Sequence, residues 1–507
     1  MGLDLLTTLM GADSSPLKHS LRDVLPYASV SCYVDSSGPE IALVFAAENV
    51  NTEDAQVFRE TVDAALAGIV EQGLDASLVE STAAAYSLST RLSLESSQVG
   101  VNTASNLAYG WACLDDLYLF VESYSAQDFM VAWNNDGTYR ELLRRFTGEN
   151  ALTALAVTVP VPGAKEEQDA ALAEKLAAVK SALTDDEIAA IVAESAGAVT
   201  DADPDLTASM VSELTAVTVE SLPEEKRIYQ IDDVTGEDGV RRMHVHASGD
   251  GVGKALLRMD LGGLDEEGLQ WCQLYISLLL DIDTSAHTAD ELSDLANSYL
   301  YGLSTKIAQP EEDNEYGYTP YFSISFTALD ENLLPAYQLL HELLFDTDFG
   351  RTESIAGRVS AYRSQLKNSI NSEGYALELY RMVGTGHEAY ALYNWVNGIP
   401  YYTFLTRVEE LLQTEPETVT ASLNAVRDYL LATGGKAISA YVGGDEGYTL
   451  CQAAADVFLQ GLGKQPVERR AYALDTAAES EALALEINTA FNLYCVSWQE
   501  LGLEGKL

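Results

Sequence analysis

The sequence predicts an α/β chain built from a duplicated module, with a helical hairpin between the two copies. Strand and helix signals alternate at both ends, the middle reads as two charged helices, and a block from the first part recurs in the last. A chain of 507 residues has room for roughly two to four units that each bury a core. We therefore expect a partial module over 1–162, a linker over 163–226 and a complete module over 227–507.

The first part begins with a helix signal and then two strand signals. SPLKHSLRDVL predicts a helix over 15–25, and the strand-like runs 28–37 and 40–49 meet at Gly38-Pro39, a pair typical of turns. Further signals predict long helices over 52–73 and 77–95 and a strand over 151–161.

The middle part reads as a helical hairpin. Its first helix carries an apolar stripe at helical spacing, formed by Leu172, Leu176, Val179 and Leu183. Thr184 and Glu187 have the spacing of a capping box, which predicts the start of a second helix. A polar stretch with two prolines then leads to the last part.

The last part returns to alternating strands and helices. Period-two alternation and turn residues define the strands, and longer apolar periodicity defines the helices. We expect strands over 227–234, 241–248, 254–263, 302–309, 318–328 and 436–444, and helices over 264–282 and within 332–432.

An internal repeat connects the first and last parts. ALVFAAEN and the helices after it resemble FSISFTALDEN and its following helices, which pairs Phe45 with Phe326 at an offset of 281. FTGENALTALAVTVP resembles LATGGKAISAYVGG, which pairs Thr147 with Thr433 at an offset of 286. The first copy lacks counterparts of the strands and helix that open the second copy at 227–302, so we expect it to be partial.

The net charge excludes one class of partner. Seventy-eight acidic residues face 29 basic ones, which gives a formal charge of −49 and a pI near 4.2. Such a chain repels phosphate backbones, so we expect no nucleic-acid binding, and it attracts cationic peptides. Solubility, or adaptation to a salty host, explains the same charge. We expect no contact with a membrane either, because the longest apolar stretch, 269–282, is too short to span a bilayer.

The five cysteines are odd in number and far apart, and no C-x-x-C occurs. This usage favours free thiols in a reducing compartment. We therefore expect a cytoplasmic protein. The N-terminus has no basic flank, and Asp4 interrupts its apolar run, so it does not read as a signal peptide.

Residues 341–345, HELLF, differ by one letter from the H-E-x-x-H signature of zinc peptidases. The repeat aligns them with 66–70, where Leu66 stands opposite His341 and Val70 opposite Phe345. Phe345 therefore reads as an apolar helix position and not as a lost histidine. The inverted motif H-x-x-E-H is also absent from the sequence.

His244 and His246 form the tightest histidine pair. Side chains at i and i+2 of a strand share a face, so both imidazoles could reach one metal ion. No Cys, Asp or Glu nearby has a diagnostic spacing for a third ligand, so we expect an exposed strand face here. A self-contained hydrolase with an unrecognised site at this pair remains an alternative.

For two other segments we predict a structural role and not a binding or catalytic site. Residues 249–254 lack the spacing of a phosphate loop, and the strand-like run after them argues against a dinucleotide fingerprint, so we expect a hairpin turn. The aromatic run GYTPYFSISF, 317–326, alternates like a strand and predicts a core face.

The order of several segments resembles the presequence-protease branch of the pitrilysin/insulinase zinc metallopeptidases, over nearly the whole chain. The similar segments are TLMGADSSPLKHSLRDVL, EEQDAALAEKLAAVKSALTDDEIAAIVAES, TAVTVESLPEEKRIYQ, DLGGLDEEGLQWCQLYISLLL and NWVNGIPYYTFLTRVEELL. The resemblance implies modules with an antiparallel-rich sheet packed by long helices. Members of the family are zinc endopeptidases in which four such modules close like a clamshell around a peptide.

The resemblance also implies that this chain carries no catalytic or metal-binding residues. In the family the first module bears H-x-x-E-H and the fourth supplies an Arg and a Tyr, and neither element has a match in this sequence. The chain then corresponds to part of module two, the hinge and module three. Zinc is expected in the full-length family protein and no cofactor in this chain, and the substrate-binding residues are unknown.

We therefore expect a non-catalytic central region of a zinc endopeptidase, inactive alone, that serves as hinge, chamber wall and peptide contact. Its expected partners are peptide substrates and a catalytic N-terminal half, in the same or a separate polypeptide. The alternative is a stand-alone inactive subunit or binding module that complements a catalytic partner in trans.

Overall fold

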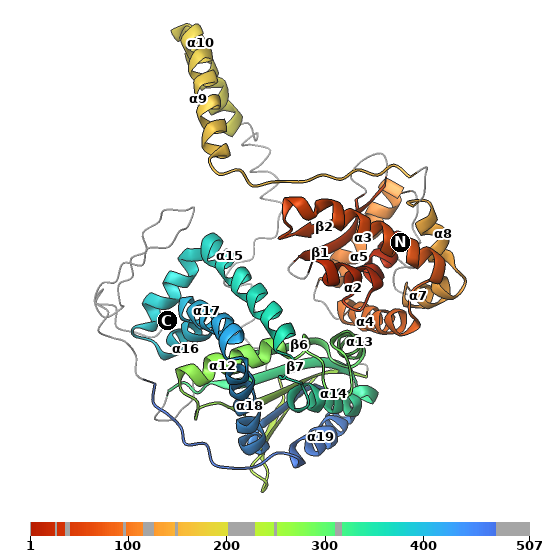
Figure 1. Cartoon of the computed structure of the whole chain (residues 1–507), viewed down its shortest axis with the longest axis vertical. Helices are drawn as coiled ribbons and strands as arrows, with labels where there is room; N and C mark the ends of the chain where they lie inside the picture. Colours follow the sequence, from red (N-terminus) through yellow and green to blue (C-terminus); the bar gives the residue numbers. More distant parts are fainter. Residues whose placement is uncertain are drawn as a thin grey trace, which may run out of the picture. The chain divides into compact units, whose positions relative to one another are not determined.

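The computed structural model describes residues 2–25, 28–35, 41–94, 98–114, 126–147, 151–200, 229–247, 251–309 and 317–472. They belong to two compact units, one made of 1–153 with 229–507 and one made of 154–228. Figure 1 colours the chain along its sequence.

The N-terminal part of the larger unit is a two-stranded sheet packed by helices. β1 (Ser29–Asp35) and β2 (Ala42–Glu48) pair antiparallel, with Cys32 opposite Phe45. Both predicted strands are confirmed, and the turn at Gly38-Pro39 lies outside the described residues. The helices and the 3-10 turn are α1 (Gly2–Gly11), α2 (Pro16–Val24), η1 (Thr52–Asp54), α3 (Ala55–Gln72), α4 (Ala76–Leu94), α5 (Val99–Tyr109), the π-helix η2 (Gly110–Leu114), α7 (Ala126–Asn135) and α8 (Thr138–Arg144).

Local signals explain where these helices start and which faces they bury. Ser15 caps α2 by accepting from the Lys18 amide, and Pro16 fits the first helical position, where no N–H is needed. The apolar stripes of α3 and α4 meet in one buried cluster with α1 and α7. The predicted helices over 15–25, 52–73 and 77–95 are thereby confirmed.

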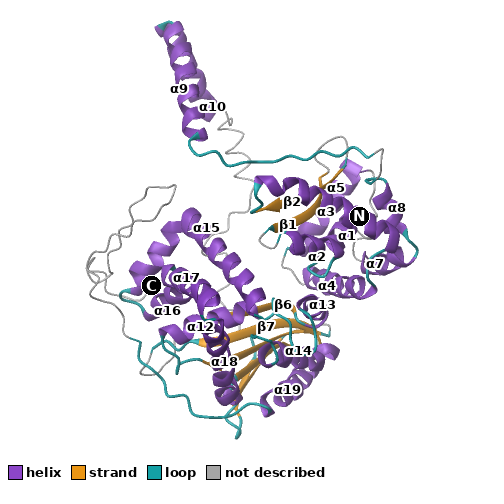
Figure 2. Cartoon of the chain, in the orientation of Figure 1, coloured by secondary structure: helices purple, strands orange, loops and turns teal. Residues whose placement is uncertain are grey.

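The last part of the chain is built on a six-stranded sheet, drawn in orange in Figure 2. Its strands are β3 (Ile231–Thr235), β4 (Arg241–His246), β5 (Val252–Asp260), β6 (Tyr301–Ala308), β7 (Tyr321–Leu329) and β8 (Ile438–Gly443). Their order is β3-β4-β8-β5-β7-β6, and only the β4–β8 pair is parallel. The expected antiparallel-rich sheet is confirmed.

Helices cover one face of this sheet. Alternate residues of β5 are buried, and so are most residues of β7; Leu257, Ile324 and Phe326 are among those that join one core with the helices. The predicted core face of the aromatic run 317–326 is thereby confirmed. The helices and the 3-10 turns are α12 (Glu266–Leu278), α13 (Ala289–Tyr299), η4 (Asp330–Asn332), α14 (Leu333–Phe345), α15 (Thr352–Gly384), α16 (Glu388–Asn397), α17 (Ile399–Thr414), α18 (Pro416–Thr433), η5 (Gly434–Lys436) and α19 (Asp445–Gln460).

The repeat seen in the sequence reappears as a repeated order of elements. In the first copy β2 leads through η1 into α3 and α4, and in the second β7 leads through η4 into α14 and α15. Both copies therefore contain a strand, a short 3-10 turn and two successive helices.

Two local predictions are wrong. Residues 151–161 form no strand: they have no ladder partner among the residues that the structure describes, and the apolar side chains that alternate along them, such as Val157 and Val159, are exposed. Residues 249 and 250 lie outside the described residues, but the predicted hairpin is wrong, because β8 lies between β4 and β5, the strands that it would join. Alternating apolar residues fit a strand only where a neighbouring strand takes up the backbone hydrogen bonds.

The smaller unit contains the predicted helix pair, α9 (Ala164–Ala182) and α10 (Asp185–Thr200). The capping box is present: the Thr184 amide donates to Glu187 at 2.8 Å, and the Glu187 amide donates to the Thr184 hydroxyl at 3.3 Å. The stripe of α9 is not buried, however, and Leu172, Leu176 and Val179 are all exposed. The polar stretch with Pro204 and Pro223 lies outside the described residues.

The free thiols agree with the cysteine pattern of the sequence. Cys32, Cys272 and Cys451 are unpaired, and the last two are buried. The side chains of Cys113 and Cys495 lie outside the described residues. Among the helices that the structure describes, none is both long and apolar enough to cross a bilayer.

Candidate functional site

The HELLF segment lies in α14 and packs as an ordinary helix. Phe345 is buried, and the ring of His341 meets the rings of Phe345 and Phe458 edge-on at centroid distances of 5.0 and 6.0 Å. Glu342 accepts hydrogen bonds from the Thr284 hydroxyl and from His287 Nδ1, the latter at 2.8 Å. The interpretation of HELLF as an apolar repeat position is confirmed.

The zinc ion that the family resemblance implies does not fit the HELLF segment. His341 lies among aromatic rings, the Glu342 carboxylate is already bonded, and the sequence contains neither zinc motif. We therefore derive no hydrolytic step for these residues.

His244 and His246 behave differently from the exposed pair expected from the sequence. His244 is only 2% exposed, because α19 covers its face of the sheet and Tyr448 stacks on its ring at 4.3 Å, parallel to within 1°. The expectation of an exposed face is wrong for His244. Period-two alternation shows that two side chains share a face, but it does not show what covers that face.

The structure supplies the carboxylates that the sequence spacing did not reveal. Asp232 on β3 lies directly opposite His244 across the antiparallel ladder, and Asp445 is the first residue of α19. His246 Nε2 is 2.8 Å from Asp232 Oδ2, and His246 Nδ1 is 3.1 Å from Asp445 Oδ1. These two carboxylates and two imidazoles form what we call the histidine–carboxylate cluster.

Hydrogen bonds orient both rings of the histidine–carboxylate cluster. His244 Nε2 lies 3.0 Å from the carbonyl oxygen of Gly443, so it carries the proton and leaves Nδ1 as a lone-pair donor. His244 Nδ1 is 4.0 Å from Asp445 Oδ1. The hydrogen bond to Asp232 is the main cause that raises the pKa of His246 above its usual value, and the charges of Asp232 and Asp445 add to it.

The histidine–carboxylate cluster has the composition of a cation site. Among the described residues, Asp232, His244 and His246 are the one group of three ligand types whose donor atoms all lie within 4.8 Å of one another. Asp232 and Asp445 were not predicted because they are distant along the chain from each other and reach the histidine pair only through strand pairing and helix packing. Asp232 lies 12 positions before His244, a separation typical of a strand–turn–strand unit, but that spacing also fits many other acidic residues.

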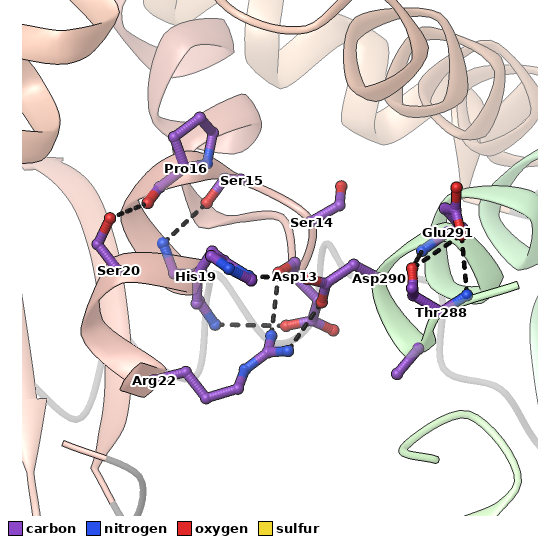
Figure 3. Close-up of polar contacts among 12 residues, drawn as sticks. Asp13, Ser14, Ser15, Pro16, His19, Ser20, Arg22, Thr288, Asp290 and Glu291 are labelled. Atoms are coloured by element: carbon purple, nitrogen blue, oxygen red, sulfur yellow. Dashed lines mark hydrogen bonds and ion pairs between the residues drawn. The ribbon is translucent and has the colours of Figure 1, made fainter. Parts of the chain in front are cut away.

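A second polar group joins the N-terminal part of the larger unit to α13, as Figure 3 shows. Arg22 Nη1 is 2.7 Å from Asp290 Oδ1, and His19 Nδ1 is 3.1 Å from Asp290 Oδ2. Arg22 also donates to the carbonyl oxygen of Asp13 at 3.0 Å. Arg22 lies in the last turn of α2 and Asp290 in the first turn of α13, so each charge also complements the dipole of its own helix.

Asp294 extends this polar group one turn along α13. Its Oδ1 accepts from the Ser14 hydroxyl at 2.6 Å and from the Ser81 hydroxyl at 3.2 Å. Partial burial raises the pKa of Asp294 above its usual value, the nearby Asp290 and Asp75 charges add to this, and the two serine hydrogen bonds oppose it. The group, hereafter the polar junction, connects α2, α4 and α13.

Comparisons with known proteins relate the chain to one family. A family model for the region associated with peptidase M16, subfamily C, matches residues 159–408. Protein HypA of Clostridium perfringens (strain 13 / Type A) is 22% identical over 510 residues, covering 97% of this chain and 50% of the relative. The mitochondrial presequence protease of Schizosaccharomyces pombe is 20% identical over 377 residues, covering 74% of this chain and 36% of the relative.

Solved structures show weaker likeness. A peptidase M16 inactive domain from Pseudomonas fluorescens is 16% identical with a TM-score of 0.35, covering 48% of this chain and 53% of that chain. A conserved protein from Enterococcus faecalis V583 is 16% identical with a TM-score of 0.32, covering 45% and 52%. Scores this low do not establish a shared overall fold.

The chain spans about half or less of the length of the curated relatives that it matches. The family match begins before the helix pair and ends within α17, so it covers the linker and most of the last part. This agrees with the order of the resembling segments and with the absence of both zinc motifs from the sequence. Residues 159–408 therefore match the region associated with peptidase M16, subfamily C, and the chain resembles the non-catalytic region of the pitrilysin/insulinase family.

Proposed function

We propose that this region serves an M16 zinc endopeptidase as hinge, as chamber wall and as a contact surface for peptides. The observation that carries the proposal is the match to the peptidase-associated family model over 159–408, which combines the helix pair and the strands β3 to β7 of the large sheet in one family segment. The helix pair α9–α10 is the candidate hinge, because it forms a compact unit of its own.

The candidate wall is the face of the six-stranded sheet opposite the helix-covered core. Side chains on this face of β5, β6 and β8 are exposed or half-buried, in contrast to the buried ones on the core face. Lys254 and Val442 face each other across β5 and β8 and are both exposed, as is Lys306 on β6. A sheet with one open face can offer both apolar and polar contacts to an extended peptide.

The net charge of the chain and the charges on the proposed wall have opposite effects on a cationic peptide. The net charge of −49 steers cationic peptides towards the chain. The proposed wall itself carries Lys254, Lys306 and the half-buried Arg258, which would repel a cationic peptide at close range. We propose that the long-range attraction dominates encounter, so that affinity for a basic peptide falls steeply as salt is added.

The first experiment measures catalysis by the chain alone. Purified chain is incubated with a quenched-fluorescent peptide, with and without added zinc, and we expect no hydrolysis above buffer. Hydrolysis that purifies with the chain and stops with a chelator would overturn the non-catalytic assignment.

The second experiment tests the wall. The double variant K254E/K306E makes the proposed contact face acidic, and K165E/K175E in α9 makes the same change in net charge elsewhere. If peptides contact the wall, anisotropy titration with a labelled basic peptide should show tighter binding for K254E/K306E, by roughly tenfold or about 1.4 kcal/mol. Equal affinities for the two double variants would refute the wall, whatever the effect of salt.

The expected partners follow from the same proposal. We propose that a zinc-bearing catalytic half, in the same or a separate polypeptide, completes the enzyme, and that the whole works in a reducing compartment. Mixing the chain with a separately expressed H-x-x-E-H module of the family would test complementation: activity that appears only in the mixture supports assembly in trans. Activity of the catalytic module that is unchanged by this chain would contradict it.

A further inference from the structure

We propose that the histidine–carboxylate cluster binds one divalent transition-metal ion, with His244 and His246 as nitrogen ligands and Asp232 and Asp445 as the available carboxylates. This site differs from the family zinc site, which needs H-x-x-E-H, and it is independent of the proposed function. Its role would be structural, because the four side chains come from β3, β4 and the start of α19.

The backbone brings the donors together before any ion is present. Asp232 and His244 are direct partners in the β3–β4 ladder, and His246 follows two residues later on the same face. The three donor atoms already lie within 4.8 Å of one another. Tetrahedral bonds of about 2.0–2.2 Å place ligand atoms roughly 3.3 Å apart, so the group needs only small side-chain rotations to close around an ion.

The orientation of His244 favours a ligand role. Its Nε2 proton is held by the Gly443 carbonyl oxygen, and Tyr448 stacks on the ring, so Nδ1 presents a fixed lone pair on the side of Asp445. Metal-binding histidines commonly donate their other N–H to a carbonyl or a carboxylate, which fixes the tautomer. The ring of His246 lies close to that of His244, with 3.9 Å between centroids.

Charge and solvent access also favour a metal ion at the histidine–carboxylate cluster. Two carboxylates neutralise a divalent ion, and the acidic chain raises the local concentration of cations. Asp445 has an 86% exposed side chain, so an ion can enter from solvent on that side. Imidazole with carboxylate suits zinc, nickel and copper, whereas magnesium prefers oxygen ligands and water, so the site should select against magnesium.

The rival explanation is a plain ion pair, in which protonated His246 lies between Asp232 and Asp445 at 2.8 and 3.1 Å. An ion pair accounts for His246 without any metal, but it leaves the oriented lone pair of buried His244 without a function. Direct titration distinguishes the two explanations.

The test is calorimetric titration of tag-free, chelator-treated chain with Zn²⁺ and, separately, with Mg²⁺. We expect one saturable Zn²⁺ site above the weak background of surface carboxylates, and no such site for Mg²⁺. The variants H246A and D232N should weaken Zn²⁺ binding at least about tenfold. Both side chains are partly exposed, at 27% and 58%, so these variants are expected to fold.

The matched control is D233N, the next residue of β3, which points to the other face and pairs with Arg241. It removes one carboxylate from the same strand and should leave Zn²⁺ affinity unchanged. A second readout is amide exchange in β3, which Zn²⁺ should slow in the unmodified chain and in D233N but not in D232N. The proposal is overturned if the unmodified chain has no saturable Zn²⁺ site, or if H246A binds Zn²⁺ as tightly.

Discussion

The two copies of the repeated strand–helix–helix unit differ in what surrounds them. In the first copy β2 pairs with β1 in a two-stranded sheet, and Phe45 on it is only half-buried. In the second copy β7 lies between β5 and β6 within six strands, and the matching Phe326 is 1% exposed. The same local sequence pattern therefore serves a small, partly open sheet in one place and a closed core in the other.

This difference shows that the repeat encodes the order of elements but not their stability. A strand gains most from burial when neighbours flank both of its edges and helices cover its face. β7 meets these conditions, while β2 has one partner among the described strands. Local unfolding should therefore begin in the N-terminal part.

The largest expected difference comes from truncating the two matching phenylalanines. F326A should lower the free energy of unfolding of the last part by about 3–5 kcal/mol, because it leaves a cavity in a packed core. F45A should cost roughly 1–2 kcal/mol, because its ring is already partly in water. Urea unfolding followed by amide exchange would measure the stability of each part separately. Equal losses of unfolding free energy in F326A and F45A would contradict the proposed difference between the two copies.

Thiol labelling gives an intermediate effect without any substitution. Burial is the main cause that raises the pKa of both Cys32 and Cys451, in each case to about 12, so neither thiol is activated as a thiolate in the folded chain. A difference in labelling rate then reports how readily each region opens. We expect Cys32 to react at least about tenfold faster, or about 1.4 kcal/mol, in alkylation followed by peptide mass spectrometry. Faster labelling of Cys451 would contradict the comparison.

The smallest expected effect concerns the polar junction between the two parts. Because burial raises the pKa of Asp294 in the folded chain, its contribution to stability is greatest below the unfolded pKa and is lost as pH rises through the folded pKa. D294N keeps an oxygen that can accept from Ser14 and Ser81 but removes the charge. We expect the variant to gain stability relative to the unmodified chain as pH rises from about 4 to 7, by roughly 0.5–1 kcal/mol.

The control for this prediction is D290N, which removes a carboxylate that is paired with Arg22 and His19. It should weaken the polar junction at neutral pH, since the ion pair is lost and no buried charge is relieved. Thermal unfolding between pH 4 and 7 measures both variants. A pH-independent difference for D294N would show that its charge is not the cause.

Most helices and strands were predictable because their signals are local. Apolar periodicity and turn residues located β1, β2 and α3, and the capping box at Thr184 located the start of α10. α13 shows a signal that the predictions overlooked, since Thr288 and Glu291 form a complete capping box in a stretch with no predicted element. The unpaired run 151–161 shows the opposite error, a strand pattern that has no partner in the described structure.

The candidate site was only half predictable. The spacing of His244 and His246 placed two imidazoles on one face, but Asp232 and Asp445 reach them through the β3–β4 register and the packing of α19. Among 78 acidic residues, no local spacing singles out these two. Their roles depend on contacts between distant segments, which periodicity cannot reveal.

The sequence by itself determined the α/β class, the duplication, the charge and the absence of both zinc motifs, because composition and short-range periodicity carry this information. Only the tertiary structure decided that β8 lies between β4 and β5, that His244 is buried, and that HELLF packs against aromatic rings. Strand order and burial depend on which distant segments meet, and that choice is made by the packing of the whole core and not by any local pattern.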